Sequence, residues 1–309
     1  MRFRITHLTK YTYAGVVSLT HNIVRMRPRN HDLQSCVWHE MSVSPAPSNR
    51  SDGIDYFGNH TSYFSLQESH RQLAITARSE VEMSARAPVD VSHGSSWEQV
   101  REILLHESDS RTVSAREFSF DSPYASRSPE LARYALSSFE EGKPFLQCVL
   151  GLTERIHRDF EFLPGSTRIG TPVLEVLRNR RGVCQDFAHL QIGCLRSLGV
   201  AARYVSGYLL TTPPPGQPRL AGADVSHAWV SVFSPEAGWV DFDPTNGLMP
   251  SDSHITVAWA RDYDDLGPIR GILVGGRRQR LQVSVDVVPV EVPPTGVAPT
   301  GVPPTEVPS

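Results

Sequence analysis

The chain is poor in cysteine, has no long apolar run and carries no large excess of charge of either sign. Its four cysteines lie far apart among 309 residues and form no CxxC pair, which argues against a disulfide framework or a structural zinc site. The first residues alternate between apolar and polar, whereas a secretory signal needs an unbroken apolar stretch of roughly 7–15 residues. No stretch approaches the roughly 20 apolar residues that span a membrane. We therefore expect a cytoplasmic protein with no membrane partner.

The charge balance and the missing metal motifs disfavour further classes of protein. With 30 basic and 33 acidic residues the net charge is −3, which gives no electrostatic reason to expect a nucleic acid as partner. The absence of HExxH and DxDxDG motifs disfavours a zinc hydrolase and a calcium-dependent cross-linking enzyme. We therefore expect neither a metal nor another cofactor. A metal-dependent hydrolase that uses His157, His189 or His227 is the weaker alternative.

Residues 1–86 are predicted to form an all-β domain. Runs of β-branched and aromatic residues alternate there with period two, and turns rich in Pro, Gly and Asn separate them. Several short strands at this spacing suggest a sandwich or a small barrel-like sheet. The histidines of this region follow no ligand spacing, so we interpret them as surface or hydrogen-bonded side chains.

Residues 95–290 are predicted to form a second, α+β domain. The apolar residues change to helical spacing, and five helices are expected, the last of them closed by Gly199. Strands then follow one another up to about residue 290, and this order of helices and strands indicates a largely antiparallel sheet. Residues 291–309 repeat Pro, Thr, Gly and Val without an aromatic residue. We expect that tail to be disordered.

Cys184 is the cysteine with the strongest claim to reactivity. It follows Gly182 and opens a predicted helix, where free backbone N–H groups and the helix dipole favour an anion. This environment favours a thiolate, and the same N–H groups can stabilise an oxyanion. Cys148 and Cys194 lie among apolar residues of helical pattern and are interpreted as core residues. On position alone, that interpretation stays open for Cys184 as well.

A thiol nucleophile needs a base, and the base needs a group that orients it. His227 lies on a predicted strand, and a five-residue connection leads to the next strand, which ends at Asp243. If Phe233 pairs with Trp239, His227 and Asp243 are diagonal partners on one face, roughly 7–8 Å apart by Cα. Asp241 shares that face but lies further from His227 and is the rival acid. The pattern predicts a Cys–His–Asp triad with Asp243 as its acid.

The segments around these residues resemble the transglutaminase-like superfamily, in particular the bacterial two-domain proteins described as transglutaminase-like enzymes or cysteine proteases. The matching segments are RRGVCQDFAHL, LRSLGVAARYVSGYL, SHAWVSVF and GWVDFDPTNG. The opening segments THLTKYTY, RMRPR and DYFGN are similar to the β domain that precedes this core in bacteria. The resemblance implies a papain-like, transglutaminase-like core behind an all-β domain. It also implies Cys184 as nucleophile, His227 as base and Asp243 as acid.

The expected reaction is the hydrolysis of a peptide or isopeptide-like amide through a thioester acyl-enzyme, with a peptide or protein amide as the substrate partner. One alternative is transfer of the acyl group to an amine, as in a transglutaminase. Another is a non-catalytic module whose N-terminal β domain binds a peptide. The second oxyanion donor stays open. So does the role of Trp229 and Trp239, which either screen the His–Asp pair from water or fill the core.

Overall fold

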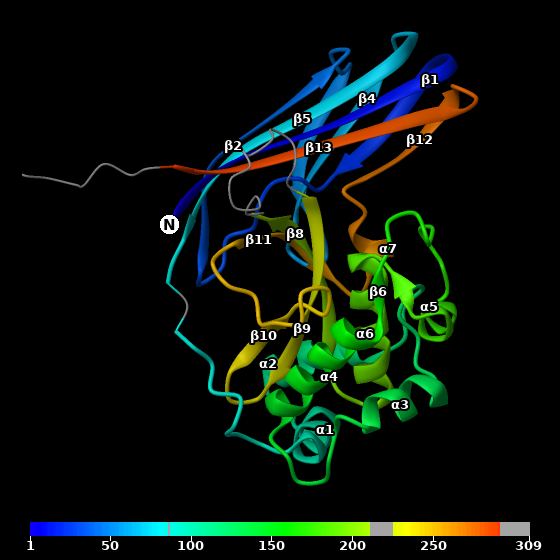
Figure 1. Ribbon diagram of the computed structural model, residues 1–309. Helices are drawn as coiled ribbons and strands as arrows, with labels where there is room; N and C mark the ends of the chain where they lie inside the picture. Colours follow the sequence, from blue (N-terminus) through cyan, green and yellow to red (C-terminus); the bar gives the residue numbers. More distant parts are fainter. Residues whose placement is uncertain (86, 211–224, 291–309) are drawn as a thin grey trace, which may run out of the picture.

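The computed structural model describes residues 1–85, 87–210 and 225–290. A sheet of long strands lies on one side of the molecule, and a core of helices and a smaller sheet lies on the other (Figure 1). The fold is therefore α+β, as predicted, with an all-β region ahead of a core of helices and a smaller sheet. The predicted tail, residues 291–309, lies outside the described residues. Among the described helices, none has the length and apolar character that a membrane span requires.

The N-terminal sheet is organised around one very long strand. The sequence pattern predicted several short strands here, but β1 runs unbroken from Arg2 to Val24. It pairs with β5 along its first half and with β4 along its second half, always antiparallel. The sheet has the order β2-β5-β1-β4-β3, and its first five strands are β1 (Arg2–Val24), β2 (Gln34–Ser44), β3 (Asn49–Ile54), β4 (His60–Leu66) and β5 (His70–Met83).

The last two strands of the described chain also belong to this N-terminal sheet. β12 (Ile269–Gly275) and β13 (Gln279–Val290) both pair antiparallel with β1. The prediction that residues 95–290 form the catalytic domain is therefore wrong for its final strands. The alternation of apolar and polar residues correctly predicts that these segments are strands. It does not tell which sheet they join, because pairing between distant segments depends on what each face of the strand can bury.

The five helices expected from the 3.6-residue spacing are present, with two additions, α2 and the four-residue α7. Ser96 caps α1 through a capping box with Gln99, and Gly199 follows α6 with φ of +82°. One of the additional helices, α2, is capped by Asp109 and is too short to show a clear period in the sequence. The helices are α1 (Trp97–His106), α2 (Ser110–Arg116), α3 (Pro129–Leu136), α4 (Phe145–Asp159), α5 (Val173–Asn179), α6 (Cys184–Ser197) and α7 (Tyr263–Leu266), with a 3-10 turn, η1 (Glu117–Ser119).

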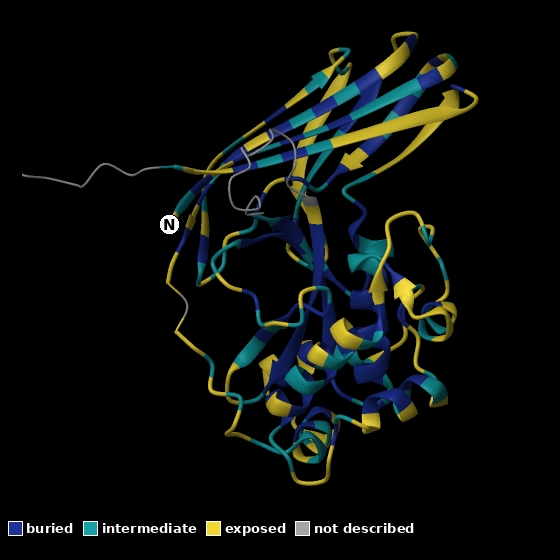
Figure 2. Cartoon of the chain, in the orientation of Figure 1, coloured by how far each residue is buried: buried dark blue, intermediate teal, exposed yellow. Residues whose placement is uncertain are grey.

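The core sheet packs against α6, which is buried along most of its length (Figure 2). Its four antiparallel strands have the order β10-β9-β8-β11. They are β8 (Ala202–Leu209), β9 (Val225–Ser234), β10 (Gly238–Phe242) and β11 (His254–Ala260), and two short strands elsewhere, β6 (Glu161–Phe162) and β7 (Arg181–Gly182), pair in parallel. The central helix thus meets the sheet that carries the predicted histidine and aspartate.

Two amide side chains of the N-terminal region cover the edge strand β11. Gln34 exchanges two hydrogen bonds of 2.7 Å with the backbone of Thr256. Asn59 exchanges two of 2.9 Å with the backbone of Trp259. These contacts take the place of a missing neighbouring strand and join the N-terminal sheet to the core.

Replacing Asn59 with alanine is expected to lower the free energy of unfolding by roughly 1–3 kcal/mol, because it leaves the partly buried N–H and C=O of Trp259 without their side-chain partner. Urea denaturation measures the change. The matched control is Asn49→Ala, since Asn49 is exposed and makes one bond of 3.5 Å to Ser65. An equal loss of stability in the two variants would contradict this role of Asn59.

Candidate active site

Cys184 is the first residue of α6, and a local network holds it there. Oδ2 of Asp186 accepts hydrogen bonds from the backbone N–H of Val183 (2.8 Å) and from the hydroxyl of Thr167 (2.5 Å). A Cβ at Gly182 would lie 2.9 Å from Asp186, so only glycine allows this close approach. Asp186 therefore caps the helix start.

The four cysteines are all free, and their exposure separates them. Cys148 and Cys194 are buried in the core, as predicted. Burial raises the pKa of the Cys148 thiol to about 11 and that of Cys194 further still. Cys36 and Cys184 are half-buried, and Cys184 lines a cleft.

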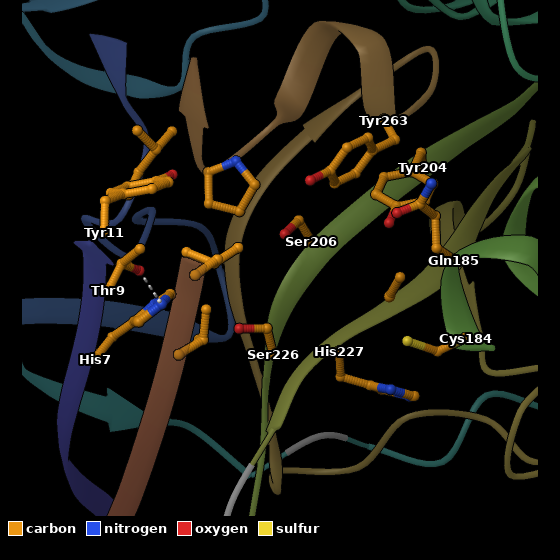
Figure 3. A pocket seen from close by; sticks show the side chains of 15 residues that line it. His7, Thr9, Tyr11, Cys184, Gln185, Tyr204, Ser206, Ser226, His227 and Tyr263 are labelled. Carbon is orange, nitrogen blue, oxygen red and sulfur yellow. Dashed lines mark hydrogen bonds between the residues drawn. The ribbon is translucent and has the colours of Figure 1, made fainter. Parts of the chain in front are cut away.

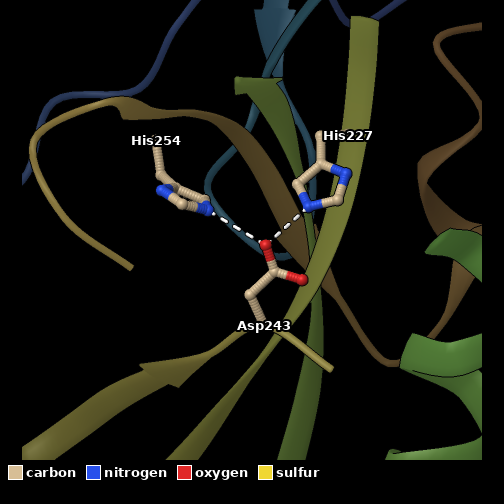
Figure 4. Close-up of side chains that lie close together, drawn as sticks. All are labelled: His227, Asp243 and His254. Atoms are coloured by element: carbon tan, nitrogen blue, oxygen red, sulfur yellow. Dashed lines mark hydrogen bonds and ion pairs between the residues drawn. The ribbon is translucent and has the colours of Figure 1, made fainter. Parts of the chain in front are cut away.

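His227 and Asp243 meet as the strand register predicts. Trp239 lies opposite Phe233, and Asp241 lies opposite Ser231. Nε2 of His227 donates to Oδ2 of Asp243 over 2.7 Å, and both side chains are buried (Figure 4). The rival acid Asp241 faces another groove, described below.

The thiol and the imidazole face each other across the mouth of the cleft (Figure 3). Because Nε2 of His227 is engaged by Asp243, Nδ1 remains for Cys184. Burial is the largest influence on the pKa of His227 and lowers it. Hydrogen bonds and charge attraction from Asp243 and Cys184 outweigh burial and raise this pKa to about 10. The imidazole is thus protonated at neutral pH.

Asp243 receives more hydrogen bonds than the predicted pair accounts for. Its Oδ2 also accepts from Nε2 of His254 (3.1 Å) and from Nδ2 of Asn246 (2.6 Å). Its Oδ1 accepts from the backbone N–H groups of Thr245 and Asn246. Burial alone would raise the pKa of Asp243, but these bonds, led by that from His227, hold it well below its usual range. The carboxylate is fixed in its charged form and in one orientation.

Sequence reasoning missed His254 and Asn246. Asn246 could have been found, since an aspartate followed by Pro-Thr-Asn-Gly is typical of a turn in which side chains bond nearby backbone. His254 opens β11, which pairs with β8 and has no contact with β10 in the sheet order. No local signal in the sequence places it beside Asp243.

Replacing His254 with alanine is expected to lower kcat roughly tenfold with little change in KM, because a hydrogen bond to a charged group contributes about 1.5–3 kcal/mol. His254 would act as a positioning residue through Asp243. Because its loss removes a donor that lowers the pKa of Asp243, the carboxylate should hold the His227 imidazolium more strongly, and the alkaline limb of the pH profile should move to higher pH. His21→Ala, in the N-terminal sheet, is the control. An unchanged pH profile together with lower stability would reduce His254 to a structural role.

Trp229 screens the His–Asp pair, whereas Trp239 lies elsewhere. The Trp229 ring is fully buried and meets His254 edge-on, with centroids 5.3 Å apart. It also covers Gly207, where a Cβ would lie 2.4 Å from the ring. Trp239 packs edge-on against Phe118 instead. Water is therefore kept from the dyad by one of the two tryptophans.

The cleft beside Cys184 lies between the N-terminal sheet and the core and has a volume of about 280 Å³ (Figure 3). β1 and β13 supply one wall, and α6, β8 and β9 supply the other. No Asp, Glu, Lys or Arg of the described chain lines it, and burial lowers the pKa of His7 to about 4, so that this histidine is neutral. The lining residues are His7, Thr9, Tyr11, Cys184, Gln185, Tyr204, Ser206, Ser226, His227, Ala228, Tyr263, Pro268, Ile269, Leu281 and Val283.

The histidines of the metal-hydrolase alternative do not gather in one place. Nδ1 of His157 donates to the carbonyl oxygen of Thr245. Nε2 of His189 accepts from the backbone N–H of Tyr263, and its ring lies against those of Tyr124 and Tyr204. The ligand-type atoms that do lie together, within 4.8 Å, are those of His227, Asp243 and His254. Asn246 donates into the same carboxylate oxygen, so this cluster is satisfied as a hydrogen-bond network.

Comparison with known proteins identifies the family. A family model described as "Bacterial transglutaminase-like N-terminal region" matches residues 3–82, and one described as "Transglutaminase-like superfamily" matches residues 138–244. An uncharacterized protein of Mycobacterium tuberculosis is 42% identical over 93% of this chain and 93% of its own length. This chain belongs to the transglutaminase-like superfamily. The superfamily match includes Cys184, His227 and Asp243.

Further relatives of this transglutaminase-like chain agree in fold or in part of the sequence. An uncharacterized protein of Mycobacterium leprae is 30% identical over 93% of this chain and 98% of its own. The solved structure of "a Putative Cysteine Protease from Cytophaga hutchinsonii" superposes with a TM-score of 0.73 and 21% identity, over 96% of this chain and 94% of that one. This likeness shows the shared papain-like, transglutaminase-like fold. A protein-glutamine gamma-glutamyltransferase of Pseudomonas aeruginosa is 38% identical over 72 residues, or 23% of this chain and 11% of its own.

Proposed function

We propose that this transglutaminase-like protein is a cysteine enzyme that hydrolyses a peptide or isopeptide-like amide through a thioester on Cys184. The observation that carries the proposal is the position of His227. Its imidazole is held by the buried carboxylate of Asp243 at 2.7 Å and hydrogen-bonds the thiol of Cys184. A nucleophile, a base and an orienting acid are therefore in contact, in an open cleft.

In the first half-reaction the sulfur of Cys184 attacks the amide carbonyl carbon and forms a tetrahedral oxyanion. The backbone N–H groups of the first turn of α6 have no partner within the helix and supply positive charge for that oxygen. When the C–N bond breaks, the protonated imidazole of His227 transfers its proton to the departing amine. The products are an acyl thioester on Cys184 and the free amine.

In the second half-reaction a water molecule attacks the thioester carbonyl. His227, now neutral, accepts a proton from that water, and the C–S bond breaks to release the carboxylic acid. The thiolate of Cys184 and the imidazolium are restored together. Asp243 keeps its negative charge throughout and stabilises the imidazolium in both steps.

The cleft indicates the chemical character of the acyl group. Its walls combine tyrosine, serine and threonine hydroxyls with the apolar side chains of β13 and the segment before β12, and none of the described lining groups is an acid or a base apart from the cysteine and histidines. A charged group placed there would lose hydration without gaining a partner. The preferred substrate is therefore an amide whose carbonyl side is neutral.

Transfer of the acyl group to an amine is the second candidate. It is favoured by the 38% identity, over 72 residues, with the protein-glutamine gamma-glutamyltransferase of Pseudomonas aeruginosa. An amine would take the place of water in the second half-reaction, and the same three side chains would serve. The two candidates differ only in the nucleophile that resolves the thioester.

The test is a screen of peptide amides and γ-glutamyl amides with the full chain, in the presence and absence of a primary amine. Acid quenching and mass spectrometry of the Cys184 peptide detect the acyl-enzyme, and released ammonia or peptide is measured alongside. Hydrolysis predicts an acyl-enzyme and a free acid with no amine incorporated. Amine incorporation would favour transfer. Binding of peptide without acylation or product across the panel would overturn an enzymatic function.

A further inference from the structure

A second groove lies on the face of β8 that points away from the catalytic cleft. Tyr204 and Ser206 line the cleft, whereas the alternating residues Arg203 and Val205 line this groove, as expected for a strand. The groove has a volume of about 630 Å³. It continues past Arg203, Trp239 and Trp259 into a neighbouring hollow of about 670 Å³.

The guanidinium of Arg203 forms the centre of the groove. It lies between the indole rings of Trp239 and Trp259, 4.1 Å and 3.9 Å from their centroids, and Arg29 stacks on Trp259 at 3.6 Å. Arg203 is only 8% exposed. Its Nε is buried without an acceptor, and its side chain makes no hydrogen bond to any residue that the structure describes.

Arg196, the other deeply buried arginine of the core, shows what such a group needs. Its guanidinium donates to five acceptors, four backbone carbonyls and the hydroxyl of Ser122. A buried guanidinium with no acceptor is costly, because its hydration is lost and nothing replaces it. Ring stacking compensates on the faces of the Arg203 guanidinium, but its Nε–H is buried without an acceptor and its Nη groups have no hydrogen bond to the described chain. Those N–H groups lie at the wall of a groove.

The groove restricts both the charge and the shape of an occupant. Arg203 and Arg111 line it together with the acids Asp32 and Asp241, so the formal charges of the lining balance and a doubly charged anion is disfavoured. Burial, opposed by Asp241, lowers the pKa of Arg203 to about 9, which still leaves it cationic at neutral pH. The remaining wall is largely apolar and aromatic, with Leu33, Val89, Val205, Val240, Trp239 and Trp259.

We propose that this groove is a binding site for a monocarboxylate with an apolar body, such as the C-terminal residue of a peptide. The planar fork of Arg203 matches a carboxylate in two parallel hydrogen bonds, which would satisfy the N–H groups that have no acceptor. The two indole rings hold that fork in one orientation. The apolar wall accommodates the side chain next to the carboxylate. The site is independent of the reaction at Cys184.

The test is calorimetric titration of the full chain with acetyl-glycyl-leucine and with the corresponding C-terminal amide. The acid is expected to bind at least roughly tenfold more tightly than the amide, since hydrogen bonds to a charged partner are lost in the amide. A second titration uses 4-methylpentanoate, a carboxylic acid without a peptide group. If it binds as tightly as acetyl-glycyl-leucine, the ligand is a free carboxylic acid; if it binds more weakly, the ligand is the C-terminus of a peptide.

Arg203→Met is expected to abolish binding of the acid. Its matched control is Arg101→Met, which removes a guanidinium from above another tryptophan, Trp97, outside the groove. If Arg203→Met fails to fold, the comparison of acid and amide in the wild type decides alone. Equal affinity for acid and amide, no saturation by the acid, or inorganic phosphate bound as tightly as the acid would each overturn the proposal.

Discussion

Replacing Cys184 with alanine is expected to lower kcat/KM for amide hydrolysis roughly 10⁴-fold or more, because no acyl-enzyme can form without the sulfur. The residual rate would come from substrate binding and the free N–H groups at the start of α6. Steady-state kinetics on the best amide of the screen measure the effect. The fold should survive, since Cys184 is half-buried and the start of the helix is held by Asp186.

The control for this prediction is Cys36→Ala, which removes the other half-buried thiol and should leave the rate unchanged. Iodoacetamide adds a measurement that needs no substrate: Cys184 should be labelled faster than Cys36, and His227→Ala should slow its labelling, because the imidazolium no longer stabilises the thiolate. Full activity in the alanine variant of Cys184, or labelling insensitive to His227, would remove the nucleophile from the mechanism.

Replacing Asp243 with asparagine is expected to lower kcat/KM roughly 10³–10⁴-fold, because the amide neither stabilises the imidazolium nor selects the productive orientation of the ring. It should also change the pH dependence. Burial lowers the pKa of His227, and Asp243 is the leading group that raises it to about 10. The wild-type rate should therefore fall only as the pH rises through about 10, whereas in the variant this alkaline limb should lie at lower pH.

The same substitution at Asp241 tests the choice between the two acids. Asp241 has the same parity as Asp243 but lies opposite Ser231, further from His227. Asp241→Asn should therefore lower kcat/KM less than roughly tenfold and leave the alkaline limb of the pH profile in place. Profiles of kcat/KM from pH 5 to about 11 separate the outcomes, because that ratio reports ionisations of the free enzyme. A larger loss at Asp241 than at Asp243 would contradict the assignment.

Much of the candidate site could be predicted because it depends on neighbours in the sequence. A glycine before a cysteine, followed by helical spacing, places the thiol at a helix start. Period two along β9 and β10, with a short connection between them, sets the register that brings His227 to Asp243. Turn chemistry and periodicity are properties of a few consecutive residues, and this part of the site uses little else.

The surroundings of that pair depend on residues far apart in the chain. His254 reaches Asp243 from β11, and His7 closes the cleft from β1, about 180 residues before Cys184 in the sequence. Neither has a pattern that distinguishes it from the other histidines. Trp229 and Trp239 have the same parity in the sequence pattern, yet one covers the dyad and the other stacks on Arg203.

The sequence by itself indicated most of the elements, the α+β class and the three candidate residues Cys184, His227 and Asp243, because local periodicity, capping and a short turn mark them. Only the tertiary structure decided that β12 and β13 join the N-terminal sheet, that His254 and Asn246 complete the environment of Asp243, and that Arg203 lies buried without an acceptor. The physical reason is that alternation tells which face of a strand is buried, while its partner is chosen by the burial and hydrogen bonding of the whole chain.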